Sequence, residues 1–459
     1  MIEATTVVWA NNEFSGAELG DKRRAKRAAR IAAGLVNCVG TAMSASCGGG
    51  GSQAVSRFFD CEEVTVNSVL SGHRKEIGVR AMKQPGRILV AQDTTVLDFK
   101  DRKNIKELGY TCANGGNGIM MHSLFVVSEQ KLPLGVLNIN LWTRDEENRG
   151  IKHKRKNRLI LEKESHKWLW GLQQVSKHLS ELGKEVLVIG DRESDIYELF
   201  AHERPSNVHL LVRIMQDRKV EVEAEKTKMY AALDASPLQG TYDLYVVDDK
   251  RTATLEVRSC RLDVCAPQAY KGINARSVSM WAVDIREVDA PADVEPLHWR
   301  LLSTLEAGSL ESSLYLADCY TGRWGIEEFH RVIKDGCKVE RLQFENLSRL
   351  CPAIAMLSIV AQQVMYLMKY SRTYPDEPAI CISTIDEQET VEDWVQIYRY
   401  KDYKVVTVAD YVRGIAFIGG FRGRKHDGQP GTKAIWEGLR NFNHLLAGRK
   451  LEQRRTART

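Results

Sequence analysis

The sequence predicts a mixed α/β protein of two or three domains, because a chain of 459 residues is too long for one compact core. Two apolar runs, "ILVAQ" and "VLVIG", indicate buried strands that each lead into an aspartate, and strand-like segments dominate from 205 to 304. We expect a basic helical unit over 1–65 and a sheet-containing core over 66–365, interrupted by a β-rich insertion at about 205–304. A mostly helical region follows over 366–459.

The composition excludes several classes of protein. A hydrophobic content of 43% and a charged content of 27% are typical of an ordinary globular protein. The start, "MIEATTVVWANNEF", lacks the apolar run of a signal peptide, and we expect no membrane segment. The 10 cysteines form no C-x-x-C pair, which favours reduced thiols and a cytoplasmic location.

The net charge of +5 is modest but unevenly distributed. Basic runs occur in "DKRRAKRAAR" (Asp21 to Arg30), in "IKHKRKNR" (from Ile151) and in the final "RKLEQRRTART". One such run is most often only a solvated face. Three runs in separate segments favour a polyanionic partner, because each neutralised phosphate releases counterions.

The N-terminal region is predicted to be helical. Residues 15–36 have a helical period, with Ala28, Ile31, Ala32 and Leu35 on one apolar face. The four glycines of "SCGGGGSQ" interrupt this pattern, and a second short helix is expected around "AVSRFF".

Two aspartates follow the predicted strands of the core. Residues 86–99 are expected to form a strand that leads to Asp93, 122–142 two strands joined by a turn, and 157–182 a helix. The strand "VLVIG" then leads to Asp191. If these strands are neighbours, both acids lie at one sheet edge, where a hard divalent cation would offset their repulsion. The alternative is that each aspartate only forms a turn or caps a helix. Three further acids, Asp98, Glu193 and Asp195, are expected to be surface or cap residues.

The segment "YTGRWGIEEFHRVIK" is predicted to lie on one helix from about Glu311 to Gly336. At about 100° per residue, one polar stripe contains Tyr320, Arg323, Glu327 and Lys334. Ile326, Phe329 and Ile333 lie on the opposite side, and Glu328 points away from the stripe. Glu327 is therefore the better ligand candidate, although an ion-paired surface helix remains the alternative.

Two aspartates and one glutamate without His or Cys ligands suit two Mg²⁺ ions about 3.5–4 Å apart. Such ions activate a water or a 3′-hydroxyl and stabilise the leaving oxygen in phosphodiester transfer. The basic runs match a nucleic-acid substrate.

These motifs resemble the DDE transposases of the bacterial insertion-sequence-four family, most closely the transposon-five type. The resemblance rests on "DTT" and "DRESDIY" after strands and on the family's Tyr-x2-Arg-x3-Glu-x6-Lys signature. Tyr320, Arg323, Glu327 and Lys334 match this signature at every spacing. The likeness covers most of the chain, including "ELGDKRRAKR", "HSL" and the "IGGF…AIWEGL" ending.

The resemblance implies a ribonuclease-H-like core and metal-dependent cut-and-paste transposition by nicking, hairpin formation, hairpin opening and strand transfer. Asp93, Asp191 and Glu327 would be catalytic and would bind two Mg²⁺ or Mn²⁺ ions. Tyr320, Arg323 and Lys334 would hold DNA phosphates. The partners would be transposon-end and target DNA and a second copy of the chain, paired through residues 366–459 in a synaptic complex near the bacterial nucleoid.

The resemblance also implies DNA contacts outside the signature. Trp299, in "PLHWRLLST", would stack on a flipped base, unless it is only a buried strand aromatic. Arg213 matches an arginine of the family's insertion, and Arg57 matches another near the N-terminus. Further candidates for recognising the transposon end are Arg23, Arg24, Arg27 and Arg30.

Two alternative functions remain open at this stage. The chain could be a catalytically inactive DNA-binding or inhibitor protein with the same fold, although the intact acid triad argues against it. It could also be a structure-selective two-metal nuclease, although such an enzyme needs neither the insertion nor a pairing domain.

Overall fold

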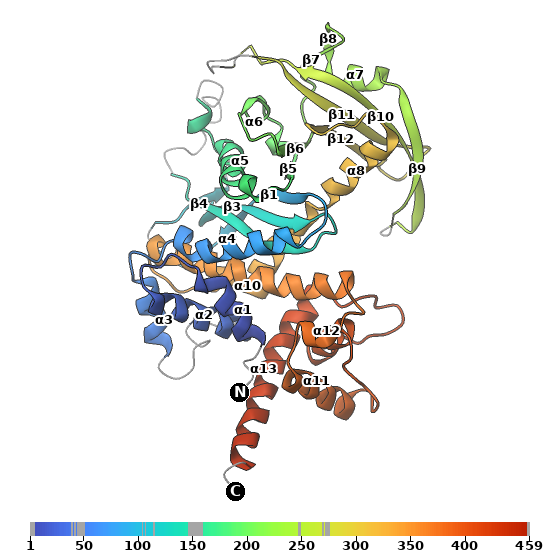
Figure 1. The fold of residues 1–459 in the computed structure, drawn as a ribbon. Helices are drawn as coiled ribbons and strands as arrows, with labels where there is room; N and C mark the ends of the chain where they lie inside the picture. The colour runs from blue at the N-terminus through green and yellow to red at the C-terminus, as the bar shows by residue number, and fades with distance from the viewer. Residues whose placement is uncertain are drawn as a thin grey trace. The chain divides into compact units, whose positions relative to one another are not determined.

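The computed structural model describes residues 5–37, 40, 43, 51–102, 104–105, 107–112, 115–145, 159–246, 249–268, 270 and 276–456. It divides into two compact units. Unit 1 comprises Met1–Gln84, Thr94–Arg149 and Gly325–Thr459, and unit 2 comprises Pro85–Asp93 and Gly150–Trp324. The fold is mixed α/β, with N-terminal helices, a large mixed sheet and a C-terminal helical region (Figure 1), which confirms the predicted fold class.

Unit 2 contains most of the mixed sheet. Its three parallel strands are β1 (Ile88–Asp98, of which the first half belongs to this unit), β5 (Val186–Gly190) and β6 (Val208–Arg213). The antiparallel strands are β12 (His298–Ser303), β11 (Val278–Val288), β10 (Arg251–Val264), β9 (Leu238–Val246), β7 (Lys219–Val222) and β8 (Glu225–Lys228). The helices are α5 (His166–Leu179), α6 (Tyr197–Ala201), α7 (Met229–Ala235) and α8 (Leu310–Thr321). The predicted β-rich segment therefore extends the parallel sheet through the β6–β12 pair.

Unit 1 surrounds a smaller group of strands with helices. The strands are β2 (Gly109–Cys112), β3 (Gly115–Ser128) and β4 (Pro133–Trp142), joined by the second half of β1. The N-terminal helices are α1 (Thr5–Ser15), α2 (Lys22–Asn37), α3 (Gly51–Phe59) and α4 (Val66–Met82). The later helices are α9 (Trp324–Arg331), α10 (Leu347–Thr373), α11 (Ile385–Tyr398), α12 (Val408–Ile418) and α13 (Thr432–Thr456). Helices α4 and α10 pack against β4.

Helix α10 is the core helix of unit 1. Among the described residues it is the one helix long and apolar enough to cross a membrane, with a mean hydropathy of 1.7 over its most apolar window. Because 78% of that window is buried within the protein, its apolar character is explained by packing.

Two of the expected helices begin or end at residues other than those predicted. The helix expected over 15–36 begins only at Lys22, because Gly20 adopts a φ of 76° and Asp21 accepts the N–H of Arg23 at 2.7 Å. The helix expected over 157–182 is α5, which is shorter and ends in a 3-10 turn before Gly183. Most of the glycine run in "SCGGGGSQ" lies outside the described residues.

The expected helix from Glu311 to Gly336 is three segments rather than one. The N–H groups of Gly322 and Arg323 bond to the carbonyls three residues earlier, which tightens the chain into a turn between α8 and α9. A π-turn follows over Val332–Gly336. The prediction of one continuous helix is therefore wrong, because Tyr320, Arg323, Glu327 and Lys334 lie on four successive parts of this path.

Candidate active site and nucleic-acid interface

The carboxyl edge of the parallel strands in unit 2 brings together two of the predicted acids. Ala91 of β1 pairs with Ile189 of β5, and continuing this register by two residues places Asp93 beside Asp191. Gly190 of β5 pairs with Val212 of β6, so the next residue, Arg213, lies beside Asp191. Asp93 itself lies within β1 rather than at its end, because β1 continues to Asp98. Two carboxylates and a guanidinium thus share one row of the sheet.

Asp191 also caps the turn that follows its strand. Its Oδ1 accepts the backbone N–H of Glu193 at 2.9 Å, so the cap proposed as the simpler alternative is present. A Cβ on Gly190 would come within 2.2 Å of Ser194 Oγ, which explains the glycine in "IGDRES". Burial raises the pKa of Asp191, more than the hydrogen bond from Glu193 lowers it. A nearby cation would therefore stabilise its ionised form.

Cationic and aromatic side chains lie close to the acid row. Arg323 Nη1 lies 3.6 Å from Asp93 Oδ2, and the Arg323 side chain is 12% exposed. The same guanidinium lies 5.8 Å from the ring centre of Tyr320, a buried residue at the end of α8. Burial, together with the charges of Arg192 and Arg323, lowers the pKa of Arg213. Arg323 and Arg213 thus place positive charge beside the two aspartates, next to the neutral ring of Tyr320.

A pocket of about 490 Å³ lies in unit 2 at the edge of strand β12. It is lined by Arg192, Arg213, Ile214, Met215, Tyr230, Glu295, Pro296, Leu297, His298, Trp299 and Arg300. Trp299 is only half-buried, so part of its surface is accessible in the pocket. Basic side chains outnumber the one acidic side chain in this lining, which suits an anionic aromatic ligand.

Sequence reasoning missed several of the pocket residues. They come from three parts of unit 2: Arg192 follows β5, Tyr230 lies on α7, and His298 and Arg300 lie on β12. His298 and Arg300 flank Trp299, so a basic-aromatic-basic triplet was visible in "LHWRLL". Asp195, expected at the surface, is instead 1% exposed and accepts the N–H groups of Met215 and Gln216 at 2.7 and 2.8 Å. It therefore anchors the loop at the rim of the pocket.

Glu327 lies on α9, which is fixed to β3 within unit 1. Phe329 stacks on Phe125 of β3 at a centroid separation of 5.1 Å, and His330 Nε2 lies 3.1 Å from Ser123 Oγ. The neighbouring Glu328 pairs with Lys369 at 3.3 Å, so the two adjacent glutamates have different environments. Lys334, in the π-turn after α9, is half-buried, and together with burial its charge lowers the pKa of His330 to about 3. Glu327 and Lys334 therefore flank a neutral, buried histidine.

The predicted N-terminal contacts lie on α2 and α3. Arg23, Arg27 and Arg30 are exposed and recur at helical spacing on one side of α2, opposite its buried alanines. Arg24 is less available, because it donates to the Leu19 carbonyl at 2.7 Å and pairs with Glu63 at 3.2 Å. Arg57 is exposed near the end of α3.

The donor chemistry of the acid row fits a hard divalent cation. Asp93 and Asp191 offer carboxylate oxygens from adjacent strands, and the buried Asp191 gains from a neighbouring positive charge. In the part of the chain that the structure describes, no three His, Cys, Asp or Glu side chains lie close enough together to hold a metal ion. Glu327 belongs to unit 1 and the aspartates to unit 2, so their convergence stays a prediction.

Two segments of the chain match known protein families. Residues 7–64, a segment that contains α2 and α3, match the family described as "Transposase DNA-binding". Residues 359–458, a segment that contains α11, α12 and α13, match the family described as "Transposase Tn5 dimerisation domain". These matches support a DNA transposase of the Tn5 type that binds DNA and forms homodimers, and the mixed α/β fold agrees with a ribonuclease-H-like transposase architecture.

Proposed function

We propose that this protein is a DDE transposase that excises and inserts an insertion sequence by a cut-and-paste reaction. The observation that supports this most strongly is the row of Asp93, Asp191 and Arg213, in a chain whose two ends match transposase DNA-binding and dimerisation families. The reaction would nick the 3′ end, form and open a hairpin, and transfer the strand to target DNA.

Asp93, Asp191 and Glu327 would hold two Mg²⁺ or Mn²⁺ ions. When bound, such ions activate the attacking oxygen and stabilise the leaving oxygen of a phosphodiester. Arg323 and Tyr320 would orient the scissile phosphate beside the acid row, and Lys334 would bind a neighbouring phosphate. The ion pair between Arg323 and Asp93 would then be exchanged for contacts to the cation and to DNA.

Two hydrogen bonds of β3 show which face of this strand carries α9 within unit 1. Thr94, which follows Asp93, bonds to His122 at 2.9 Å. The next residue of β3, Ser123, bonds to His330 of α9 and therefore points to the opposite face. Glu327 lies three residues before His330, on the same side of α9, and we propose it as the third metal ligand.

The pocket beside β12 would receive a base that is rotated out of the duplex during hairpin formation. Trp299 would stack on that base, and Arg213 would bind its phosphate. Stacking would offset the cost of unstacking the base, which must leave the helix before the strand can bend back.

The two ends of the chain would assemble the complex. Arg23, Arg27, Arg30 and Arg57 would contact the transposon end, with Arg24 as a supporting residue. The C-terminal helices would pair two protomers, each holding one end, in a synaptic complex. The protein would act in the bacterial cytoplasm, close to the nucleoid.

The test uses the full-length protein, Mg²⁺ and a labelled duplex carrying the inverted repeat that flanks the gene. We expect a 3′ nick, then a hairpin at the end of the element, and then joining to a second DNA. Binding without cleavage would instead identify an inactive DNA-binding or inhibitor protein. Cleavage that never proceeds to a hairpin or joining would identify a nuclease.

A further inference from the structure

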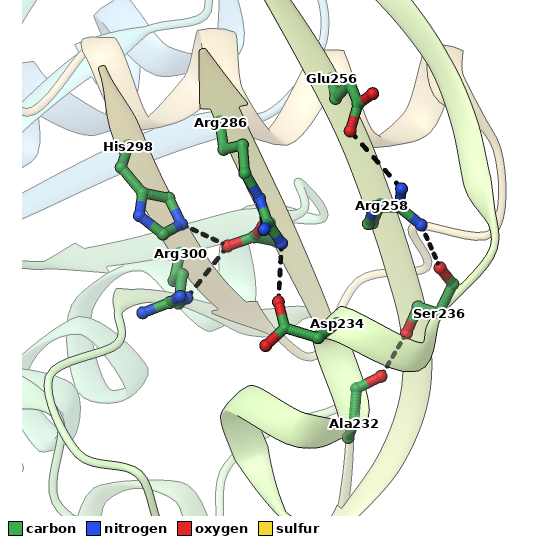
Figure 2. A network of polar contacts seen from close by, with 9 residues as sticks. Ala232, Asp234, Ser236, Glu256, Arg258, Arg286, His298 and Arg300 are labelled. Carbon is green, nitrogen blue, oxygen red and sulfur yellow. Dashed lines mark hydrogen bonds and ion pairs between the residues drawn. The ribbon is translucent and has the colours of Figure 1, made fainter. Parts of the chain in front are cut away.

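A buried carboxylate, Asp284 of β11, contacts two residues that line the pocket at β12. Asp284 of β11 is 1% exposed and lies beside Arg300 of β12 and Arg258 of β10 in the strand register. Figure 2 shows His298, Arg286 and Arg300 converging from two neighbouring strands, and all three donate to this carboxylate. Neither the acid row nor the proposed metal site uses Asp284.

The two oxygens of Asp284 have separate roles. Oδ1 lies 2.6 Å from His298 Nε2 and 3.0 Å from Arg300 Nε, and both of these residues line the pocket. Oδ2 accepts from Arg286 Nε and Nη2 at 3.0 and 2.8 Å. Arg286 also donates to Asp234 at the end of α7, at 2.8 Å, so the carboxylate is tied to α7 as well as to its own sheet.

The contact with Asp284 leaves part of each pocket cation available. Among the described residues, the side-chain hydrogen bond of Arg300 uses Nε, which leaves its two terminal amino groups for a ligand. The Arg300 guanidinium lies 4.0 Å from the ring centre of Tyr230, and its side chain is 24% exposed. The His298 side chain is 35% exposed, with Nδ1 directed away from the bond to Asp284. Both cations are thus held in one orientation at the pocket wall.

We propose that Asp284 is a positioning residue that orders His298 and Arg300, on one face of β12, to bind the phosphate of an unpaired nucleotide whose base reaches across the strand edge to Trp299 on the other face. This inference rests on the proposed function of the pocket. The ordering matters because a free arginine side chain loses rotamer entropy when it binds a phosphate. Asp284 removes that cost in advance, because its contacts hold the guanidinium in the ligand-free protein.

The sign of the effect distinguishes positioning from simple electrostatics. Removing a negative charge near a basic pocket should strengthen anion binding if Asp284 acts only through its charge. Removing the residue that orients Arg300 and His298 should weaken binding instead, because both side chains become mobile. Asp284→Asn keeps the size of the side chain and one carbonyl acceptor, and therefore separates the two effects.

The experiment measures binding without strand cleavage. The probe is a duplex with a short single-stranded overhang that contains 2-aminopurine, whose fluorescence is quenched when it stacks on Trp299. We expect Asp284→Ala to weaken the quenching titration by about 10-fold and Asp284→Asn by about 3-fold. Binding of a blunt duplex of the same length should change by less than about 2-fold. Trp299→Ala should remove the quenching, which identifies the stacking partner.

Glu256→Ala provides the matched control. Glu256 is another acid on the same sheet that contacts an arginine, Arg258 at 3.5 Å, but it does not line the pocket. We expect this variant to bind the overhang probe as the wild type does. Unchanged or tighter binding by both Asp284 variants, or an equal loss on blunt DNA, would overturn the proposal. If Asp284→Ala fails to fold, Asp284→Asn decides the question. Because the probe is not cut, a failure of the proposed transposition reaction would appear separately, in the cleavage assay.

Discussion

Individual acids differ sharply in their surroundings, and this difference predicts different mutant phenotypes for Glu327 and Glu328. Glu328 pairs with Lys369 and with Arg331, at 3.3 and 3.7 Å, whereas Glu327 is assigned to the metal site. We expect Glu327→Ala to reduce strand cleavage by about 10³-fold or more while DNA-end binding stays nearly intact.

Glu328→Gln is the adjacent control for this prediction. It should lower the thermal midpoint slightly, through the loss of its ion pairs, and retain cleavage. Cleavage and end binding would be measured on the same labelled duplex. Full cleavage activity in Glu327→Ala would remove this residue from the metal site.

Lys334 is predicted to contribute through its charge. It lies in the π-turn after α9, and the proposed function assigns its charge to a DNA phosphate. We expect Lys334→Ala to weaken DNA binding and to reduce the slope of log K against log[salt] by about 1, because one fewer phosphate is neutralised. Lys404, which is 68% exposed and pairs with Glu392, is the control at a distant part of the C-terminal region. A loss of affinity that does not depend on salt would instead indicate a structural role for Lys334.

A site residue can be predicted from the sequence when its neighbours along the chain indicate where it lies in the fold. Asp93 and Asp191 could be found because each follows an apolar run, and parallel strands bring such positions to one edge. Asp284 and Asp195 could not, because their partners lie on other strands and loops whose register the sequence does not reveal. In the sequence, an acid that faces solvent looks the same as an acid surrounded by partly buried donors from other strands.

At the level of elements, the glycines of the "IGGF…AIWEGL" ending are explained by a close helix crossing. A Cβ on Gly438 of α13 would come within 2.0 Å of the Ile415 carbonyl oxygen of α12. A Cβ on Gly419 would meet the Ala434 carbonyl oxygen at the same distance. Trp436 of the same motif covers Gly336 at the end of the π-turn, where a Cβ would lie 2.9 Å from its ring. The motif therefore fixes α13 against α12 and against the segment that carries Lys334.

This crossing predicts that Gly438→Ala is destabilising although alanine favours helices. The added methyl group should force α12 and α13 apart, at a cost of about 1–3 kcal/mol, and should weaken homodimer formation. Gly448→Ala, also in α13, is the control, because a Cβ at that position meets nothing within 4 Å. Gly448→Ala should stabilise the helix by up to about 1 kcal/mol. Thermal unfolding and sedimentation measure both variants, and equal behaviour of the two would contradict the packing argument.

Strands were predicted more accurately than helix ends. The strand pair expected over 122–142 corresponds to β3 and β4, because its alternating apolar residues and its turn are local signals. The helix expected from Glu311 to Gly336 failed, because the break at Gly322 depends on two i→i+3 hydrogen bonds that no periodicity reveals. Tyr320 and Arg323 are therefore brought near the acid row by a turn, rather than by a stripe along one helix.

At the level of the whole molecule, buried titratable groups link the N-terminal helices to the sheet of unit 1. Glu13 of α1 bonds to His73 of α4 at 2.5 Å and to Arg80 at 2.6 Å, and His73 Nε2 accepts the N–H of Val136 in β4 at 3.0 Å. Burial would raise the pKa of Glu13, but His73 and Arg80 outweigh it and hold the pKa at about 2. Burial lowers the pKa of His73 despite its contact with Glu13. The site thus favours an ionised glutamate and a neutral histidine.

These shifts predict a loss of stability in acid with a definite sign. Glu13 has a folded pKa of about 2 against an ordinary value of 4.5, so its contribution is complete above pH 4.5 and is lost as the pH falls toward 2. His73 and His330 have lowered pKa values, so unfolding takes up protons as the pH falls below 6.5. All three groups therefore destabilise the protein in the same direction. His330, whose pKa falls to about 3, should alone contribute a slope of up to about 1.4 kcal/mol per pH unit between pH 6.5 and 3.

Urea unfolding measures this slope when the free energy of unfolding is determined at a series of pH values from about 7.5 to about 4. Replacing His330 by Gln keeps a polar partner for Ser123 but removes the group that takes up a proton. The variant should be less stable than the wild type at pH 7.5, yet lose less stability as the pH falls, so the two curves should converge in acid. His426→Gln is the control, because it makes the same substitution at a side chain that is 78% exposed. Parallel curves for wild type and His330→Gln would mean that His330 is not held neutral, and the docking of α9 on β3 would then need another explanation.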